Sequence, residues 1–410
     1  MSEYLVERHV VKPTHKDYVV LDNLCFLSKN LYNATLYYVR QHYFTSKNHV
    51  RYEMVNRVFT HAKQPDYIAL PAKVSKHTQK LVDKNYRSFF TLKQSKIPDI
   101  RKQARIPKYL PKDGRQVVHY EKGALSLVKA GFIKLSKTNV LIKTKLKKCD
   151  IEFARVVPHG NHIAIEIGYK ANYPSSKPTG KIGANIASID IGLNNLATLT
   201  STVATPIIFN GRPLKSINQY ANKQAAIETT KLDTGVKKSR ARKDAIFLKR
   251  KNKISTYLHK VSRHIVNYLV SNNIDTLVIG KNVGWKQNIN IGKKNNQNFV
   301  NIPFATFIEQ LIYKSRLHGV EVVLQEESYS SKCSFLDNEP VQKHGKYKGR
   351  RVKRGLFKTA NNTFINADVN GSANILKKYL QTKEAWNDDI KSNLVEMCST
   401  SFIQKITPSL

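Results

Sequence analysis

The order of the apolar segments in the second half of the chain restricts its fold more than any other feature. Three short β-type segments follow one another at 185–192, 196–201 and 204–211, close enough to pair through hairpins. A basic stretch from about 213 to 273 comes next. In its second part, apolar residues recur at the spacing of one helical face: Ile254, Leu258, Val261, Ile265 and Leu269. This half of the chain therefore combines paired strands with long helices.

Two further strands complete the pattern. They are expected at 276–279 and 320–325, with a helix near 303–317 between them and a last helix that starts near Ala367. Three hairpin-linked strands, a helix, and two strands separated by a helix form the order of an RNase H-like α/β domain. Such a sheet places its chemistry at the carboxyl ends of its central strands, so functional side chains are expected there.

The first half of the chain has a different pattern. Residues 21–40 and 72–93 are predicted helices, and proline-bearing loops follow the second of them. From about 115 to 170 the chain alternates apolar and polar residues in short segments, and residues 4–11 do the same. These segments predict a small antiparallel β-barrel interrupted by a helical insertion at about 20–112.

A stretch rich in Pro, Ser, Gly and Lys at 172–181 marks the boundary between the two halves. We predict three regions: a wedge-like barrel with its helical insertion at 1–180, the α/β domain at 181–380 and a C-terminal tail at 381–410. Within the α/β domain, a basic insert occupies about 328–364.

The net charge is the strongest global property of the chain. There are 69 Lys and Arg residues against 29 Asp and Glu, a formal net charge of +40. A surface this basic repels itself unless a polyanion neutralises it, and phosphate neutralisation drives nucleic-acid binding. Ordinary solvated lysines and a basic membrane-surface protein are the alternatives, but the charge is spread along the whole chain. Nucleic acid is therefore the expected partner.

Compartment and redox state follow from simple absences in the sequence. No apolar run approaches the roughly 18 residues of a membrane helix, and the first residues do not have the layout of a secretion signal. We expect a cytoplasmic protein without a membrane partner, associated with the nucleoid if its host is a prokaryote. The cysteines are far apart, without a CxxC, so neither disulfides nor a Cys-based zinc site is expected: Cys25, Cys149, Cys333 and Cys398.

Two aspartates stand where the predicted strands and helices would present them. Asp190 follows Ile189 in the first strand, and an acid among bulky apolar residues is costly to bury unless a cation neutralises it. Asp368 stands at the start of the last helix, where the alternative is that Asn366 or Asp368 only caps the helix. A lone Asp190 could likewise be a turn residue. Paired in an RNase H-like order, the two aspartates favour metal ligation.

Several blocks, in this order, resemble a known family. They are IDIGLNNLATL, VSRHIVNYLVSNNIDTLVIGKN, YSSKCS and NADVNGSANI, and they are similar to the RuvC-type nuclease of TnpB proteins. TnpB proteins are transposon-encoded, RNA-guided DNA nucleases similar to type V CRISPR effectors. The resemblance covers most of 182–380 and extends more weakly to the first half, as a wedge barrel with recognition helices.

The resemblance implies a particular chemistry. It implies an Mg²⁺-dependent endonuclease that cuts double-stranded DNA next to a short flanking motif and uses a guide RNA from its own transposon end. Two Mg²⁺ ions, with Mn²⁺ as an alternative, would be held by three carboxylates and would clamp the attacking and leaving oxygens of a phosphodiester. Asp190 and Asp368 match two of the three acids.

The chain departs from the family at two places. The family's second motif ends its strand with Glu, but Gly280, Lys281 and Asn282 stand here. The paired CxxC of a zinc ribbon is also missing, so we predict no zinc.

The missing acid is predicted to come from the adjacent strand. Residues 320–325 run into Glu326 and Glu327, and this strand would lie next to the strand that ends at Gly280. Because Gly280 has no side chain, it leaves a path open for an acid to reach the strand of Asp190. Successive strand residues face opposite ways, so only one glutamate should serve, and Glu327 is preferred with Glu326 as the alternate. In the opposing interpretation both glutamates are solvated and the nuclease is inactive.

Further residues are expected to bind nucleic acid. On the predicted helix 72–93 they are Lys80, Lys84 and Arg87. In the basic insert, which could also be a solvated loop, they are Lys346, Tyr347, Arg350, Arg351, Lys353 and Arg354, with Phe357 as a second candidate for base stacking. Trp285 is either a packing residue or a stacking platform.

Two other functions remain open on the sequence. One is a catalytically inactive, RNA-guided DNA-binding protein that acts as a repressor. The other is a transposase that transfers strands itself, although no Tyr- or Ser-recombinase constellation is recognisable.

Overall fold

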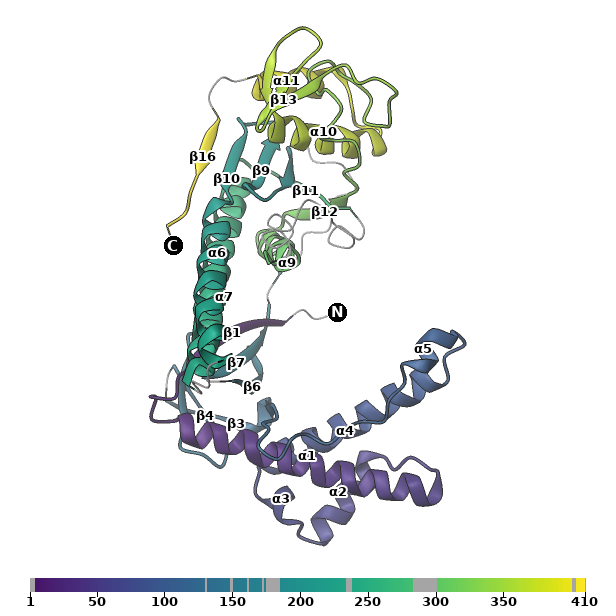
Figure 1. The fold of residues 1–410 in the computed structure, drawn as a ribbon, viewed down its shortest axis with the longest axis vertical. Helices are drawn as coiled ribbons and strands as arrows, with labels where there is room; N and C mark the ends of the chain where they lie inside the picture. The colour runs from purple at the N-terminus through teal and green to yellow at the C-terminus, as the bar shows by residue number, and fades with distance from the viewer. Residues whose placement is uncertain are drawn as a thin grey trace. The chain divides into compact units, whose positions relative to one another are not determined.

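The computed structural model describes residues 4–409 except 130, 148–149, 161, 172, 175–184, 234–237, 283–300 and 400–402. The chain divides into two compact units, Met1–Ala171 (unit 1) and Asn172–Leu410 (unit 2), whose elements are shown in Figure 1. No helix in the described part of the chain is long and apolar enough to cross a membrane.

Unit 1 contains two antiparallel sheets. The larger has the order β1 (Tyr4–Val11), β7 (His162–Lys170), β6 (Ile151–His159) and β2 (Val118–Glu121). The smaller consists of β3 (Leu125–Lys129), β4 (Phe132–Leu135) and β5 (Leu141–Lys143), with the short 3-10 helix η1 (Lys122–Ala124) before it. The predicted strands all form, but the pairings between described residues make two separate sheets, and barrel closure stays a prediction.

Five helices lie between β1 and β2: α1 (Tyr18–Ser46), α2 (Tyr52–His61), α3 (Pro65–Ile68), α4 (Ala72–Lys93) and α5 (Pro98–Lys102). The two long ones pack against each other and share the core of unit 1 through Leu31, Leu36 and Tyr86, which are fully buried. A proline at the start of α3 and of α5 fits the helix N-terminus, where its missing N–H costs nothing. The outer face of α4 is basic, whereas the exposed side chains of α1 include Val19, Tyr37 and Phe44.

Unit 2 is built on a six-stranded mixed sheet of order β12-β11-β8-β9-β10-β16. Strands β8 (Ile186–Ile191), β9 (Asn195–Ser201) and β10 (Ile207–Asn210) are antiparallel neighbours, whereas β11 (Thr276–Gly280) and β12 (Glu321–Gln325) run parallel to β8. Strand β16 (Gln404–Ile406) adds to β10 at the other edge. The mixed α/β character predicted for this half is confirmed.

Helices cover both faces of the sheet. On one face α7 (Lys238–Ser271) and α9 (Phe304–Arg316) share a core with the strands, and α6 (Arg212–Asp233) packs along α7 (Figure 1). The predicted stripe on α7 is fully buried at Leu258, Val261 and Ile265, and each such side chain contributes about 1.5–3 kcal/mol. On the other face α10 (Ala367–Thr382) lies on β8, β9 and β11, with α11 (Asp388–Cys398) beyond it.

Three segments differ from the sequence-based expectation. Strand β12 was expected to be buried on both faces, and this was wrong, because it is an edge strand with two exposed and three half-buried residues. The segment predicted as a C-terminal tail contains α11 and β16. Part of the basic insert forms a small antiparallel sheet of β13 (Arg350–Lys353), β14 (Leu356–Lys358) and β15 (Phe364–Asn366).

Candidate active site

Asp190 stands at the carboxyl end of the central strand. Its neighbour Ile189 is paired with Ile279 of β11, so Gly280 is level with Asp190, and Gly280 is in turn paired with Gln325 of β12. The carboxyl ends of three parallel strands therefore meet at one edge of the sheet. A side chain that leaves β12 just after Gln325 has to pass over Gly280 to approach Asp190.

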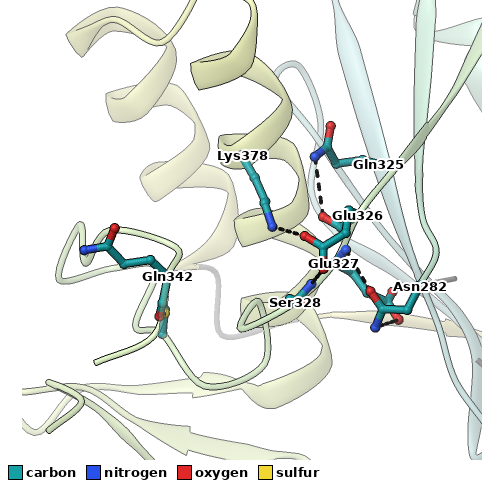
Figure 2. Close-up of polar contacts among 8 residues, drawn as sticks. Asn282, Gln325, Glu326, Glu327, Ser328, Gln342 and Lys378 are labelled. Atoms are coloured by element: carbon teal, nitrogen blue, oxygen red, sulfur yellow. Dashed lines mark hydrogen bonds and ion pairs between the residues drawn. The ribbon is translucent and has the colours of Figure 1, made fainter. Parts of the chain in front are cut away.

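Glu327 takes that path. A Cβ atom built on Gly280 would lie 2.6 Å from Oε2 of Glu327 and 2.5 Å from Cδ1 of Ile375. Contacts this short do not occur for real Cβ atoms, so only glycine fits at this position while Glu327 keeps its place. Asn282 holds the same side chain: its Nδ2 donates to Oε1 of Glu327 at 3.2 Å, and the Glu327 amide donates to its Oδ1 at 3.3 Å (Figure 2).

Glu326 turns the other way. Figure 2 shows its carboxylate directed to Lys378 of α10, with which it forms an ion pair, while the Ser328 amide donates to it at 2.8 Å. Burial raises the pKa of Glu326, but the hydrogen bonds from Lys378 and Ser328 outweigh it and leave this pKa below its ordinary value. The alternation expected of two consecutive residues is therefore present, and Glu327 is the member that faces Asp190.

Asp368 reaches the same region from α10. Asn366 caps the helix by accepting from the amides of Asp368 and Val369 at 2.9 and 3.3 Å, so the capping role belongs to Asn366 and leaves the Asp368 carboxylate available. Asn195 donates to one carboxylate oxygen of Asp368 at 2.6 Å, and Arg351 lies 3.4 Å from the other.

A second glycine lets α10 approach the sheet. A Cβ atom on Gly371 would lie 2.7 Å from Oδ2 of Asp190. Ser372 follows and shares hydrogen bonds with Ser188 and Thr200 of the sheet. The small residues at the start of α10 therefore hold the helix against β8 and bring Asp368 toward Asp190.

The charges of Glu327 and Asp368 act on Asp190. Burial, followed by the charges of Glu327 and Asp368, raises the pKa of Asp190 to about 8, against a smaller opposing effect of Arg351. Burial, followed by the charge of Glu326, raises the pKa of Glu327 to about 7. A nearby cation would stabilise the ionised form of carboxyl groups such as these, whose pKa values are raised. We call Asp190, Glu327 and Asp368 the acid cluster.

The acid cluster has the donor chemistry for Mg²⁺, which prefers carboxylate oxygens and retains several waters. Among the residues that the structure describes, no group of three or more His, Cys, Asp or Glu side chains is arranged closely enough to hold a metal ion. Arg351 occupies one oxygen of Asp368 and stands in part for the missing positive charge. The donor chemistry of the three acids therefore suits a divalent ion, whereas their present spacing, with Arg351 on Asp368, does not bring all three onto one ion.

The predicted nucleic-acid residues are on the surface. On α4, Lys80, Lys84 and Arg87 are exposed; Arg87 pairs with Asp83 at 3.2 Å, and Lys80 lies 5.3 Å from the centre of the Tyr52 ring. In the basic insert Tyr347 is half-buried and the cations are exposed: Lys346, Arg350, Arg351, Lys353 and Arg354.

Of the aromatic residues expected to stack on bases, one is buried and one is not described. Phe357 is 1% exposed and packs in the core beside α10, so the suggestion that it stacks on a base is wrong. Trp285 lies outside the described residues.

Sequence reasoning missed the two asparagines that hold the acids. Asn195 is the first residue of β9 and Asn282 follows the end of β11, both at the edge where Asp190 lies. The usable signal was their position: an amide next to a predicted strand end can orient a carboxylate.

Comparison with known proteins identifies what the chain resembles. Residues 162–286 match the OrfB_IS605 family, described as a probable transposase, and residues 304–375 match the TNB domain of Cas12f1-like proteins. These two matches cover strands β8 to β12 of the unit 2 sheet and the start of α10, but not the edge strand β16.

One curated protein and two solved structures are also similar to the chain. The chain is 24% identical over 405 residues to the TnpB-like protein ORF457 of Acidianus two-tailed virus, an alignment that covers 87% of this chain and 83% of that protein. The resemblance to TnpB-type proteins that the sequence blocks indicated is thereby confirmed. Two solved structures align at 12% identity: a Cas12f1–sgRNA–target DNA complex (90% of this chain, 98% of that chain, TM-score 0.35) and a CRISPR–Cas12f ternary complex (87% and 80%, TM-score 0.37). At these TM-scores the two alignments carry no argument about the fold.

Proposed function

We propose that this protein is an RNA-guided DNA endonuclease whose active site is the acid cluster of unit 2. The observation that carries the proposal is the convergence of Asp190, Glu327 and Asp368 from β8, β12 and α10 at the carboxyl edge of the sheet. The matches to TnpB-type proteins give this cluster its chemical context.

Unit 2 is in this proposal an RNase H-like domain of the RuvC type. The strand order β12-β11-β8-β9-β10 supports it: three antiparallel strands are followed by two that run parallel to the first. In such a sheet the central strand presents its acid beside the acid of a neighbouring strand. Here the neighbouring strand β11 presents Gly280, and the acid arrives from one strand further on.

Asp190, Glu327 and Asp368 would hold two Mg²⁺ ions, which would activate the attacking group and neutralise the charge that develops on the phosphate. The rest of the site orients these ligands. Asn195 fixes Asp368 and Asn282 fixes Glu327 through the hydrogen bonds given above. Arg351, which is exposed and contacts Asp368, is placed to receive a phosphate of the DNA strand once a metal takes over its carboxylate.

The partners in this proposal are a guide RNA from the transposon end and double-stranded DNA with a short flanking motif. The net charge of +40 supports polyanionic partners in general. The TnpB resemblance supports this particular pair, in which base pairing selects the sequence and the protein contacts backbone and flanking motif.

The test compares two adjacent glutamates. The purified ribonucleoprotein is given Mg²⁺ and a DNA target that matches its copurified RNA, and nicking and double-strand cutting are measured. We expect Asp190→Ala and Glu327→Gln to reduce cleavage at least 100-fold, and Glu326→Gln, the matched control, to stay within a few-fold of wild type. Cleavage by Glu327→Gln at the wild-type rate would refute the assignment. Guided DNA binding without any wild-type cleavage would identify an inactive, repressor-like protein, and joined DNA products would identify a strand-transferring transposase.

A further inference from the structure

Helix α1 carries an exposed aromatic stripe that the proposed function does not use. Asn33, Tyr37, Arg40 and Phe44 follow one another at helical spacing on one face of α1. Tyr37 is 59% exposed and Phe44 46%. Exposed apolar groups that lie together on a surface mark a contact site, whereas single scattered ones are ordinary.

A loop from elsewhere in unit 1 completes this stripe. Asn33 makes two hydrogen bonds with the backbone of Leu110, at 3.0 and 2.9 Å, and Lys29 donates to the carbonyl of Lys112 at 2.8 Å. Further along, Arg115 makes a bidentate pair with Asp22 at 2.8 and 2.7 Å. The loop therefore runs antiparallel to α1 and is fixed at several points.

This loop places Tyr109 next to Arg40. The guanidinium carbon of Arg40 lies 4.9 Å from the centre of the Tyr109 ring and 5.6 Å from that of Phe44. Tyr109 is itself 44% exposed. The three side chains thus form a Tyr109–Arg40–Phe44 ladder in which a planar cation lies near two rings that both retain exposed surface.

Charge identifies the occupant. Asp22 is the only acid in α1, it is bound by Arg115, and residues 103–112 of the loop contain none. A protein partner would have to bring its own acid to neutralise Arg40, whereas a nucleic acid brings phosphates together with flat bases. Aromatic rings and arginine planes are the groups on which proteins stack unpaired bases.

We propose that Tyr109, Arg40 and Phe44 form a stacking platform for an unpaired nucleobase of a bound nucleic-acid strand. The base extends the ladder on the exposed surface of Tyr109 or Phe44, and the charge of Arg40 attracts the adjoining phosphate. This goes beyond the proposed nuclease and does not depend on the acid cluster, because a platform in unit 1 binds bases whether or not unit 2 cuts DNA.

The test measures how much the bases themselves contribute to binding. Fluorescence anisotropy gives the affinity of the full-length protein for labelled single-stranded RNA, for DNA of the same length, and for an abasic DNA that keeps its phosphates. Because a chain of charge +40 binds any polyanion, the readout is the ratio of affinities for base-bearing and abasic DNA. We expect wild type to prefer the base-bearing strand by roughly tenfold.

The variants separate stacking from charge. Tyr109→Ala and Phe44→Ala should remove most of that preference, and Tyr109→Phe and Phe44→Tyr should retain it. Arg40→Lys keeps the charge but loses the plane, so it should weaken the preference without changing the salt dependence of binding. Tyr220→Ala, at a 66% exposed tyrosine in unit 2, is the matched control and should behave as wild type.

Each outcome decides the proposal. A wild-type ratio in both alanine variants overturns it, and so does a change in the oligomeric state of those variants, which would make the stripe a contact between copies of the chain. If the preference is lost, the strand, RNA or DNA, whose affinity falls more in Tyr109→Ala is the one bound. Cleavage is measured separately, so loss of the platform with Asp190-dependent cutting intact leaves the nuclease proposal unaffected.

Discussion

Replacing Gly280 with alanine tests the route by which the Glu327 side chain reaches Asp190. The new Cβ atom would lie 2.6 Å from Oε2 of Glu327 and 2.5 Å from Cδ1 of Ile375. Each of these atoms must move back by about 0.8–0.9 Å to reach the 3.4 Å at which ordinary contact begins. Ile375 is fully buried, so it cannot move freely.

Two quantities should change together. Overpacking of this kind costs about 1–3 kcal/mol of unfolding free energy, which lowers the melting temperature by about 1–4 °C for a chain of 410 residues. A catalytic carboxylate displaced by nearly 1 Å reduces the cleavage rate by about 100-fold. Urea unfolding monitored by circular dichroism gives the first quantity, and cleavage by the ribonucleoprotein gives the second.

Two further variants separate the causes. Gly345→Ala is the control, since nothing lies within 4 Å of a Cβ built there, and it should change neither quantity. Adding Ile375→Val to Gly280→Ala deletes Cδ1, so stability should partly recover while cleavage stays low. Wild-type stability and cleavage in Gly280→Ala would refute the reasoning, because Glu327 could then not lie over Gly280.

Three more predictions follow from the ionisable groups. First, the pKa of Asp190 is about 8 against an ordinary 3.8, so between these pH values the folded state binds one more proton than the unfolded chain, and the stability of the metal-free protein falls as pH rises through this window. Asp190→Asn should therefore raise the melting temperature of the metal-free protein at pH 7, as measured by calorimetry. An unchanged or lower melting temperature would contradict this. Second, Mg²⁺ binding should release about one proton near pH 7 and should become tighter as pH rises from about 6 to 8, because the pKa values of Asp190 and Glu327 are about 8 and 7. Titration calorimetry in buffers of different ionisation enthalpy measures the proton release, which should be smaller for Glu327→Gln. Third, burial, followed by the charges of His77 and Arg155, lowers the pKa of His119 from 6.5 to about 4, so the unfolded chain binds more protons between these pH values and stability is lost as pH falls through them. His119→Phe replaces the imidazole, whose ring stacks on His77 at 3.9 Å, by an uncharged ring, so the melting temperature of the variant should decline less than that of wild type as pH falls. An equal decline in variant and wild type would count against this assignment.

The sequence predicted the skeleton of unit 2 because that skeleton rests on local, periodic signals. The stripe at Leu258, Val261 and Ile265 is set by helix periodicity alone, and it is buried as expected. The facing of Glu327 was not accessible in this way. It depends on β12 being an edge strand and on Lys378 of α10 holding Glu326, and both are tertiary facts.

Other misses have the same origin. Phe357 looked like a stacking residue in a basic run, but the turn before it directs its ring into the core beside α10. Strand β16 pairs with β10, from which it is separated by nearly two hundred residues, and no local pattern announces such a pairing. The ladder of Arg40 could not be read from sequence either, because Tyr109 reaches it through the hydrogen bonds of Asn33.

The contact between Gly280 and Glu327 also bears on how such a site can evolve. Every amino acid other than glycine has a Cβ atom, so any substitution at position 280 meets Glu327 or Ile375 before a restored side chain can do anything useful. Moving the acid back to β11 therefore requires losing Glu327 first, and that intermediate has neither acid. If the proposed function is right, each single step would reduce activity more than the two steps together, which is epistasis between neighbouring positions. Relatives with a glutamate at the position of Glu327 are therefore expected to keep a glycine at the position of Gly280, and the two residues should be lost together.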